Sequence, residues 1–229
     1  MVIDVVIPAL DEEQSIHRVL QDIPHRLVRS VVVVDNGSTD RTAAVARSAG
    51  AQVVAEPRRG YGSACLAGIR HSSSQEPPPD VLVFLDADYS DHPDQMEQVL
   101  EPIVAGRADL VIGSRVLGSR EPGALLPQAR FGNLVAAVLI RLLYRVRITD
   151  LGPFRAIRAE ALLSLGMADR DYGWTVEMQV KAAKAGLQVE EVPVSYRRRI
   201  GKSKITGTLA GSMRAGWKIL ATIFRYARS

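Results

Sequence analysis

Short apolar runs that alternate with helix-length segments constrain the fold of this chain more than any other feature. In the first 115 residues these runs are rich in Val and Ile and span residues 2–7, 31–34, 53–55, 81–85 and 110–113. Helical candidates lie between them at residues 13–25, 40–49, 62–72 and 93–105. Strands that are apolar on both faces and alternate with helices are typical of parallel sheets. The front of the chain is therefore predicted to form an open parallel α/β sheet.

The pattern changes after Arg115. A loop at 116–127 precedes a helix at 128–146, a short strand at 154–157 and a helix at 173–185. A strand at 189–196, a basic loop at 197–206 and an amphipathic helix at 209–228 follow. A chain of 229 residues fits one domain. We expect a single domain over residues 1–229, with a front half at 1–115, a back half at 116–206 and a C-terminal amphipathic helix at 207–229.

Charge is distributed unevenly along the sequence. Residues 1–115 contain 10 Lys and Arg against 17 Asp and Glu, a balance of −7, whereas residues 116–229 contain 19 against 8, a balance of +11. The basic half suggests an anionic partner, although a solvated basic surface explains the charge equally well. The lone Cys65 excludes an internal disulfide, and neither a signal peptide nor a membrane-spanning run is recognisable. We expect a cytoplasmic protein.

Polar side chains collect where the predicted strands end. Asp11 follows the first strand, Asp35 the second, Asp86 and Asp88 the fourth, and Arg115 the fifth. The carboxyl ends of parallel strands form one rim, at which open α/β sheets bind their ligands. Asp and Asn also favour turns, but turn preference accounts less well for four strand ends that converge. A binding site is predicted at this rim.

The segment VLVFLDAD at residues 81–88 is the sharpest signal. Two carboxylates spaced i, i+2 on extended backbone point to the same side, where they repel unless a cation lies nearby. Carboxylate oxygens suit Mg²⁺ or Mn²⁺, which also bind phosphate oxygens. Asp86 and Asp88 are therefore the predicted metal ligands. Residues 86–90 also fit the D-x-D-x-S motif of haloacid-dehalogenase-like phosphotransferases, but in that class the motif follows the first strand of the domain.

Taken together, these segments resemble family 2 glycosyltransferases of the GT-A fold, and within them the dolichyl- and polyprenyl-phosphate mannosyl- and glucosyltransferases. The matching segments keep the family's order: VIPALDE (6–12), VDNGSTD (34–40), DADYSDHP (86–93), GSR (113–115), DLGPFR (150–155), GWTVEM (173–178) and RIGKSK (199–204). The resemblance implies a three-layer α/β sandwich with a mostly parallel central sheet. It also implies metal-dependent transfer of a hexose from a nucleoside-diphosphate sugar of the GDP-mannose or UDP-glucose type, with inversion.

The resemblance also implies roles for single residues. The nucleoside pocket would be lined by Pro8, Leu10, Glu12, Val34 and Asp35. Ribose, diphosphate and metal would be contacted by Asp86, Ala87 and Asp88, and phosphates by Arg115, by Arg198 or Arg199, and by Lys204. The base stays open, because Leu10-Asp11 stands where relatives often have Tyr-Asn, and Asp35-Asn36 where many have Asp-Asp. The glycine-rich segment 59–68 is expected to open a helix near the donor diphosphate or sugar.

The acceptor decides whether a general base is needed. A lipid phosphate is already an anionic nucleophile, whereas a hydroxyl acceptor needs a carboxylate such as Glu177 or Asp150 to take its proton. Asp88, Arg115 and Glu177 are the catalytic candidates. We expect a polyprenyl or dolichyl phosphate as acceptor. Transfer to a soluble hydroxyl acceptor stays open, and so does a binding module without turnover.

Two helices raise the question of a membrane partner. Helix 128–146 and the tail helix combine apolar faces with basic residues, namely Arg130, Arg141, Arg145, Lys218, Arg225 and Arg228. Such helices can lie in the membrane interface, or they can pack on the sheet or against a second subunit. The expected partners are the nucleotide-sugar donor, a lipid phosphate, and either the inner face of the membrane or a second copy of the chain. No nucleic-acid partner is expected.

Overall fold

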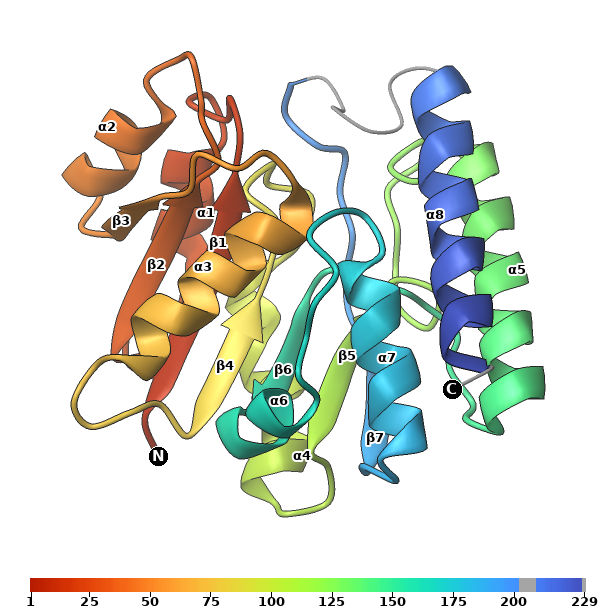
Figure 1. Cartoon of the computed structure of the whole chain (residues 1–229). Helices are drawn as coiled ribbons and strands as arrows, with labels where there is room; N and C mark the ends of the chain where they lie inside the picture. The colour runs from red at the N-terminus through yellow and green to blue at the C-terminus, as the bar shows by residue number, and fades with distance from the viewer. Residues whose placement is uncertain (202–208, 228–229) are drawn as a thin grey trace.

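The computed structural model describes residues 1–201 and 209–227, with side chains for residues 1–201 and 215–227. The described residues form a seven-stranded sheet with helices on both faces (Figure 1). The strands are β1 (Ile3–Ala9), β2 (Ser30–Asp35), β3 (Gln52–Ala55), β4 (Val81–Phe84), β5 (Leu110–Ser114), β6 (Arg155–Arg158) and β7 (Val189–Pro193). Their order in the sheet is β3-β2-β1-β4-β6-β5-β7.

The sheet is parallel except for one strand. Strand β6 lies between β4 and β5 and runs antiparallel to both, while the other neighbouring strands pair in parallel. The register pairs Ala9 at the end of β1 with Asp35 at the end of β2. The parallel strands therefore end at one edge of the sheet, which is the upper edge in Figure 1. The predicted mostly parallel sheet is confirmed.

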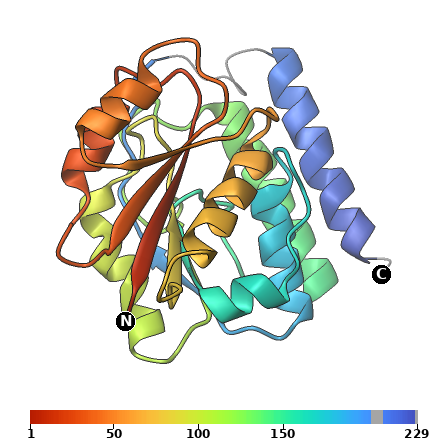
Figure 2. The same ribbon diagram turned by 60° about the vertical axis from the view of Figure 1, so that its left-hand side comes forward.

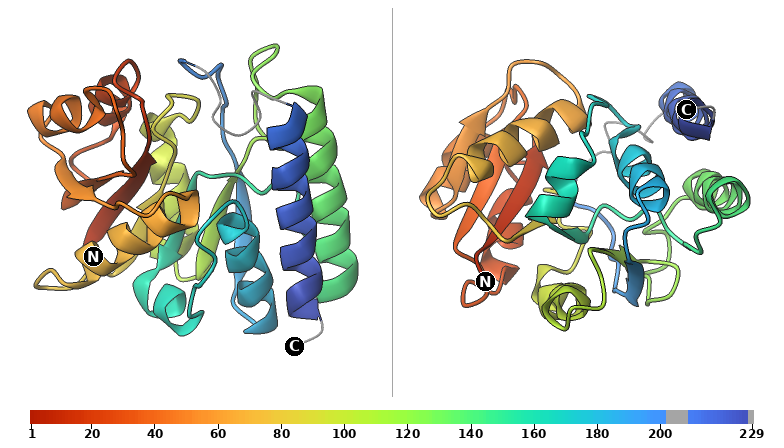
Figure 3. Two further views of the ribbon diagram at one scale, coloured as in Figure 1. Left: turned by 45° about the horizontal axis from the view of Figure 1, so that its top comes forward. Right: turned by 60° about the horizontal axis from the view of Figure 1, so that its bottom comes forward.

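Helices cover both faces because successive strand residues point to opposite sides. The helices are α1 (Ile16–Asp22), α2 (Thr42–Ser48), α3 (Tyr61–Ser73), α4 (Met96–Val104), α5 (Pro127–Tyr144), α6 (Ala159–Ser164), α7 (Trp174–Lys184) and α8 (Leu209–Ala227), with a 3₁₀ turn, η1 (Pro93–Gln95), before α4. Val6 contributes to a core with α3, α5 and α7, whereas Val5 and Ile7 contribute to a core with α1 and α4. Figures 2 and 3 show these layers from other sides. The three-layer α/β sandwich is confirmed.

Two elements differ from the sequence prediction. Helix α6 was not predicted, because six residues give too short a periodic signal to recognise. The strand expected at 189–196 ends at Pro193 instead, since proline has no N–H to continue a ladder. Tyr196 then makes only an isolated bridge to Arg120.

Helices α5 and α8 lie side by side at the β7 end of the molecule (Figures 1 and 3). Helix α5 buries Ala136, Ala137 and Ile140, and the hydroxyl of its last residue, Tyr144, donates to the carbonyl oxygen of Ile223 in α8. No helix within residues 1–201 and 209–227 is long and apolar enough to cross a membrane.

Candidate active site

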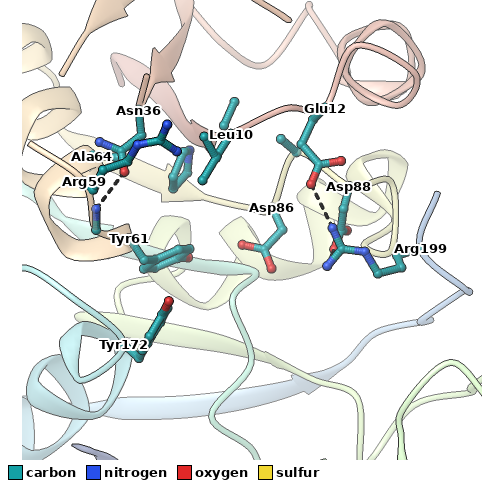
Figure 4. Close-up of a pocket in the computed structure, with 14 residues that line it drawn as sticks. Leu10, Glu12, Asn36, Arg59, Tyr61, Ala64, Asp86, Asp88, Tyr172 and Arg199 are labelled. Atoms are coloured by element: carbon teal, nitrogen blue, oxygen red, sulfur yellow. Dashed lines mark hydrogen bonds and ion pairs between the residues drawn. The ribbon is translucent and has the colours of Figure 1, made fainter. Parts of the chain in front are cut away.

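A cavity of about 310 Å³ opens at the carboxyl edge of the sheet, between the ends of β1, β2 and β4 and the N-terminus of α3. Figure 4 shows its side chains pointing toward one another from these elements. The lining comprises Pro8, Ala9, Leu10, Glu12, Asn36, Arg59, Gly60, Tyr61, Ala64, Asp86, Ala87, Asp88, Tyr172 and Arg199. The rim predicted from the strand ends is therefore hollow, and seven of the predicted site residues line it: Pro8, Leu10, Glu12, Asp86, Ala87, Asp88 and Arg199.

The buried strand β4 delivers Asp86 and Asp88 to this cavity. The turn that follows is fixed by its own polar groups: the N–H of Asp86 donates to Asp91 Oδ2 at 3.1 Å, and the N–H of Ser90 donates to Asp88 Oδ1 at 2.9 Å. Tyr89 between them has a positive φ of 66°. The buried side chain of Asp91, which is 1% exposed, thus fixes the conformation of the turn through its hydrogen bond to Asp86.

The three carboxyl groups of this turn repel one another. Burial raises the pKa of Asp86 well above its usual value, and the charges of Asp88 and Asp91 raise it further. Burial also raises the pKa of Asp91 to about 7, and its Oδ1 has no hydrogen-bond partner in the described part of the chain. A cation placed at Asp86 and Asp88 would relieve this repulsion.

The ligand set suits a cation that is shared with a substrate. Among the described residues no group of three or more His, Cys, Asp or Glu side chains is arranged to hold a metal. Mg²⁺ commonly binds through one or two carboxylates together with substrate phosphates and water. Asp86 and Asp88 therefore fit a divalent ion that completes its coordination with phosphate oxygens.

Arg199 supplies the positive charge beside these carboxylates. Its guanidinium contacts Glu12 Oε1 at 2.8 Å and Asp88 Oδ2 at 3.1 Å (Figure 4). The basic loop that carries it is bound to the Asp88 turn, because the N–H of Arg197 donates to Ser90 O and that of Ile200 to Asp88 O, both at 2.9 Å. Of the expected phosphate-binding residues, Arg199 is the one placed in the cavity. Lys204 lies outside the described residues.

Arg115 does not line the cavity, contrary to our expectation. Its Nε and Nη2 donate to the two carboxylate oxygens of Asp150, each at 2.7 Å, and its guanidinium stacks over the ring of Tyr196 at 5.0 Å. Burial opposes ionisation of Asp150, but the charge and hydrogen bonds of Arg115 outweigh it and lower the pKa of that carboxyl below its usual value. The charge of Arg115 is thus neutralised by a buried partner.

Glu177 is also placed away from the cavity. It is fully buried in α7, where its carboxylate accepts from the N–H groups of Ala168 and Asp169 and from the Tyr226 hydroxyl of α8. Lys181 Nζ lies 2.8 Å from it. This carboxylate ties three segments together and is not among the residues that line the cavity, where a catalytic role would place it.

Three other predicted residues lie outside the lining. Val34 is fully buried in the sheet, and Asp35 Oδ1 accepts from the N–H of Ser38 in the following turn. The Arg198 side chain donates to the carbonyl oxygen of Pro122. Arg198 therefore holds the loop that precedes α5, and Arg199 alone of the two faces the cavity.

The sequence placed Asn36 at the rim and segment 59–68 near the donor, but it did not indicate what their side chains contact. The amide of Asn36 donates to the carbonyl oxygens of Glu56 and Arg58, and its Oδ1 accepts from the N–H of Gly60, which fixes the start of α3. Tyr61 and Tyr172 form the lower wall in Figure 4. Segment 59–68 was expected near the donor, and Tyr61, between two glycines, was the available signal. Tyr172 carried none.

Comparison with known proteins finds relatives that match most of this chain. The sequence model of glycosyl transferase family 2 matches residues 4–166. An uncharacterized glycosyltransferase of Mycobacterium tuberculosis is 41% identical over 96% of this chain and 98% of its own. The undecaprenyl-phosphate mannosyltransferase of Micrococcus luteus is 31% identical over 90% of this chain and 88% of its own. The haloacid-dehalogenase-like interpretation is thereby set aside.

A solved structure confirms the fold assignment. Glucosyl-3-phosphoglycerate synthase from M. tuberculosis, in complex with Mn²⁺, uridine diphosphate and glucosyl-3-phosphoglycerate, superposes with a TM-score of 0.80. It is 25% identical in sequence, and the match covers 99% of this chain and 80% of the synthase. The fold is that of the GT-A glycosyltransferases. With the family model, the relatives and the fold in agreement, this chain belongs to glycosyl transferase family 2 and is a glycosyltransferase.

Proposed function

We propose that the protein transfers a hexose from a nucleoside-diphosphate sugar to a polyprenyl phosphate, with Mg²⁺ or Mn²⁺ held by Asp86 and Asp88. The donor part rests on one cavity in which two carboxylates and Arg199 meet. The related synthase, solved with Mn²⁺ and uridine diphosphate, supports the same use of this fold. In this proposal residues 1–115 are the donor half of the domain and residues 116–206 are its acceptor-side half.

The reaction is a displacement at the anomeric carbon of the donor sugar. An oxygen of the acceptor phosphate forms a bond to that carbon, while the bond to the donor's diphosphate oxygen breaks and its electron pair leaves with the nucleoside diphosphate. The divalent ion supplies Lewis-acid stabilisation of the leaving diphosphate when it is bound. Arg199 adds a fixed positive charge on the same side of the cavity, where it stabilises the charge that develops. Attack from the opposite face inverts the configuration.

The burial of two carboxylates is the observation on which we base the choice of a phosphate acceptor. Both candidate bases of the back half are fully buried, Asp150 against Arg115 and Glu177 against Lys181 and Tyr226. Neither is placed to take a proton from a hydroxyl in the cavity. An acceptor that is already ionised needs no such base, which favours a phosphate. The undecaprenyl-phosphate mannosyltransferase among the relatives supports a lipid phosphate.

The outer face of α5 supports work at a membrane surface. Phe131, Leu134 and Leu142 lie on this face with exposures of 69%, 59% and 70%, next to the exposed Arg141 and Arg145. Residues 122–149 contain no Asp or Glu. An apolar stripe edged by arginines complements a membrane surface with anionic headgroups. Two copies of this face would repel each other, because both are positively charged. In this proposal the protein is peripheral to the inner face of the membrane.

A soluble acceptor is the second candidate function. It is favoured by the synthase, which has also been solved in complex with phosphoglyceric acid. Such an acceptor is itself anionic, so the basic loop at 197–199 suits either class. The two candidates differ in whether the attacking oxygen belongs to a phosphate or to a hydroxyl.

Transfer assays with defined acceptors separate the two candidates. The protein is incubated with UDP-glucose or GDP-mannose and Mn²⁺, together with undecaprenyl phosphate in detergent or with phosphoglyceric acid. The proposal expects an acid-labile lipid-linked sugar and no product with phosphoglyceric acid, and Asp88→Asn serves as the inactive control. A sugar product on phosphoglyceric acid alone would replace the lipid phosphate by the soluble acceptor.

A further inference from the structure

Tyr61 is held rigidly at the first turn of α3. Its ring packs edge-on against Trp174 with centroids 6.1 Å apart, and Trp174 in turn packs on Phe84 at 4.8 Å. The glycines on either side of it let the start of α3 pack closely on the backbone at residues 169 and 170. A Cβ on Gly60 or on Gly62 would lie 2.1 Å from the carbonyl oxygen of Arg170 or Asp169. The position of the phenol is therefore set before any ligand arrives.

The hydroxyl at the end of this ring lacks a proper partner. It is buried, and no oxygen or nitrogen of the described residues hydrogen-bonds to it. The Cys65 thiol, one turn further along α3, interacts with it, but a thiol is a weak hydrogen-bonding group. Buried hydroxyl groups are normally paired, since an unpaired one destabilises the protein. A fixed, buried and unpaired hydroxyl in a cavity points to a bound ligand.

The hydroxyl can act as a donor. A tyrosine phenol keeps its proton at neutral pH, so it can donate to an acceptor oxygen. Figure 4 shows the hydroxyl directed toward Asp86 across the cavity. On the other side of Asp86, Arg199 Nε is also buried without a hydrogen-bond partner among the described residues. The Tyr61 hydroxyl at the cavity wall is thus a donor that an acceptor oxygen of a bound ligand would satisfy.

We propose that the Tyr61 hydroxyl donates a hydrogen bond to an oxygen of the nucleotide-sugar donor and thereby helps select it. This inference rests on the proposed function only in taking a nucleoside-diphosphate sugar as the ligand. The oxygen belongs either to the nucleoside diphosphate or to the sugar. A site built to pair a hydroxyl discriminates strongly against ligands that leave the site's own group unpaired.

Tyr61→Phe tests this role, because it keeps the ring and removes only the hydroxyl. Binding of UDP, UDP-glucose, GDP and GDP-mannose is measured by calorimetry in the presence of Mn²⁺, and the unfolding temperature is measured without ligand. We expect affinity for the cognate donor to fall about tenfold, as for the loss of one hydrogen bond. We also expect the ligand-free variant to melt about 2 to 4 °C higher, since an unpaired buried group has been removed. A purely structural hydroxyl would give the opposite shift in melting temperature.

Tyr144→Phe is the matched control. The Tyr144 hydroxyl donates to the Ile223 carbonyl oxygen at the far end of α5, so its loss should lower the melting temperature and leave donor affinity unchanged. Weaker binding of the Tyr61 variant to both UDP and UDP-glucose assigns the contact to the nucleoside diphosphate, and weaker binding to the sugar nucleotide alone assigns it to the sugar. Unchanged affinity for every donor, or a lower melting temperature of Tyr61→Phe, overturns the proposal. None of these measurements depends on the acceptor, so failure of lipid transfer leaves them interpretable.

Discussion

At the scale of single residues, the site is an arrangement of charges that compensate one another only in part. The strand-end carboxylates Asp86 and Asp88 were predictable, because the position of a residue after a buried strand determines the edge at which it lies. The partners of Arg115 were not predictable, since Asp150 follows it by 35 residues and only the fold brings them together. A residue type at a strand end thus predicts location more reliably than role.

Asp88→Asn removes one of the two carboxylates proposed to hold the metal. We expect transfer activity to be lost and donor binding to become independent of Mn²⁺, while circular dichroism and melting temperature stay close to wild type. The wild-type enzyme should lose activity in EDTA and regain it on addition of Mn²⁺. Activity that persists in the variant or in chelator would contradict the assignment of the metal.

Arg115→Ala and Arg199→Ala should fail in different ways. Arg115→Ala leaves the buried Asp150 carboxylate unpaired, so it should lower the free energy of unfolding by about 3 kcal/mol. Arg199→Ala should leave stability nearly unchanged and cost about 3 kcal/mol of transition-state stabilisation, as for the loss of one preorganised donor. Chemical denaturation and kcat/KM measure the two effects. A stable, slow Arg115 variant would restore Arg115 to the donor site.

The stability lost in Arg115→Ala should also depend on pH. The folded-state pKa of Asp150 lies below its unfolded value, so the ion pair stabilises the protein above the unfolded pKa. That stabilisation is lost as pH falls through the folded pKa. The difference in unfolding free energy between wild type and variant should therefore narrow in acid, which denaturation at a series of pH values measures. A difference that stays constant down to the acid range would rule out this ion pair as the source.

At the scale of elements, the long periodic segments and Val-rich runs were predicted well, and the short or irregular pieces were not. Helix α6 is too short to show periodicity, and the end of β7 depends on a single proline. The role of Glu177 was missed for a different reason. A helical glutamate inside a segment that matches the family resembles a catalytic base. Only the packing of α8 over α7 shows that Glu177 is buried and joins these helices.

Glu177→Gln tests that structural role. The amide keeps the shape but loses the charge facing Lys181 and one strong acceptor for the N–H groups of Ala168 and Asp169. We expect a loss of about 2 kcal/mol in unfolding free energy and a kcat within about twofold of wild type at permissive temperature. Glu160→Gln, at an exposed position in the first turn of α6, is the control and should change neither. A large drop in kcat without a loss of stability would return Glu177 to catalysis.

At the scale of the whole molecule, the cavity and the exposed face of α5 suit different environments, one aqueous and the other apolar. In the proposed function the cavity binds a water-soluble nucleotide, whereas the α5 face presents apolar side chains that water does not favour. The sequence shows that residues 1–115 carry a net negative charge and residues 116–229 a net positive charge. It did not indicate which helix face would stay exposed, because that depends on which residues the sheet and α7 cover.

Leu134→Asp combined with Val138→Asp places two negative charges on the α5 face. We expect the wild-type protein to sediment with anionic phosphatidylglycerol vesicles at low salt and the double variant to stay in solution. Leu163→Asp, 60% exposed on α6, is the matched control and should sediment like wild type. If the wild-type protein sediments with neither anionic nor neutral vesicles, the membrane proposal is wrong. A dimer that the double variant abolishes would assign the face to a second copy.

The insertion of β6 between β4 and β5 ties the order of folding to the order of synthesis. Both neighbours precede β6 in the sequence, so β5 has no place in the sheet until residue 155 and its followers have left the ribosome. At about 5 to 20 residues per second, the free edge of β4 stays open for about 4 to 14 s after residue 84 is made. A chain truncated after residue 115 would thus expose an unpaired strand edge immediately before Asp86 and Asp88. Residues 1–115 are thus synthesised several seconds before the sheet to which their strands belong can be completed.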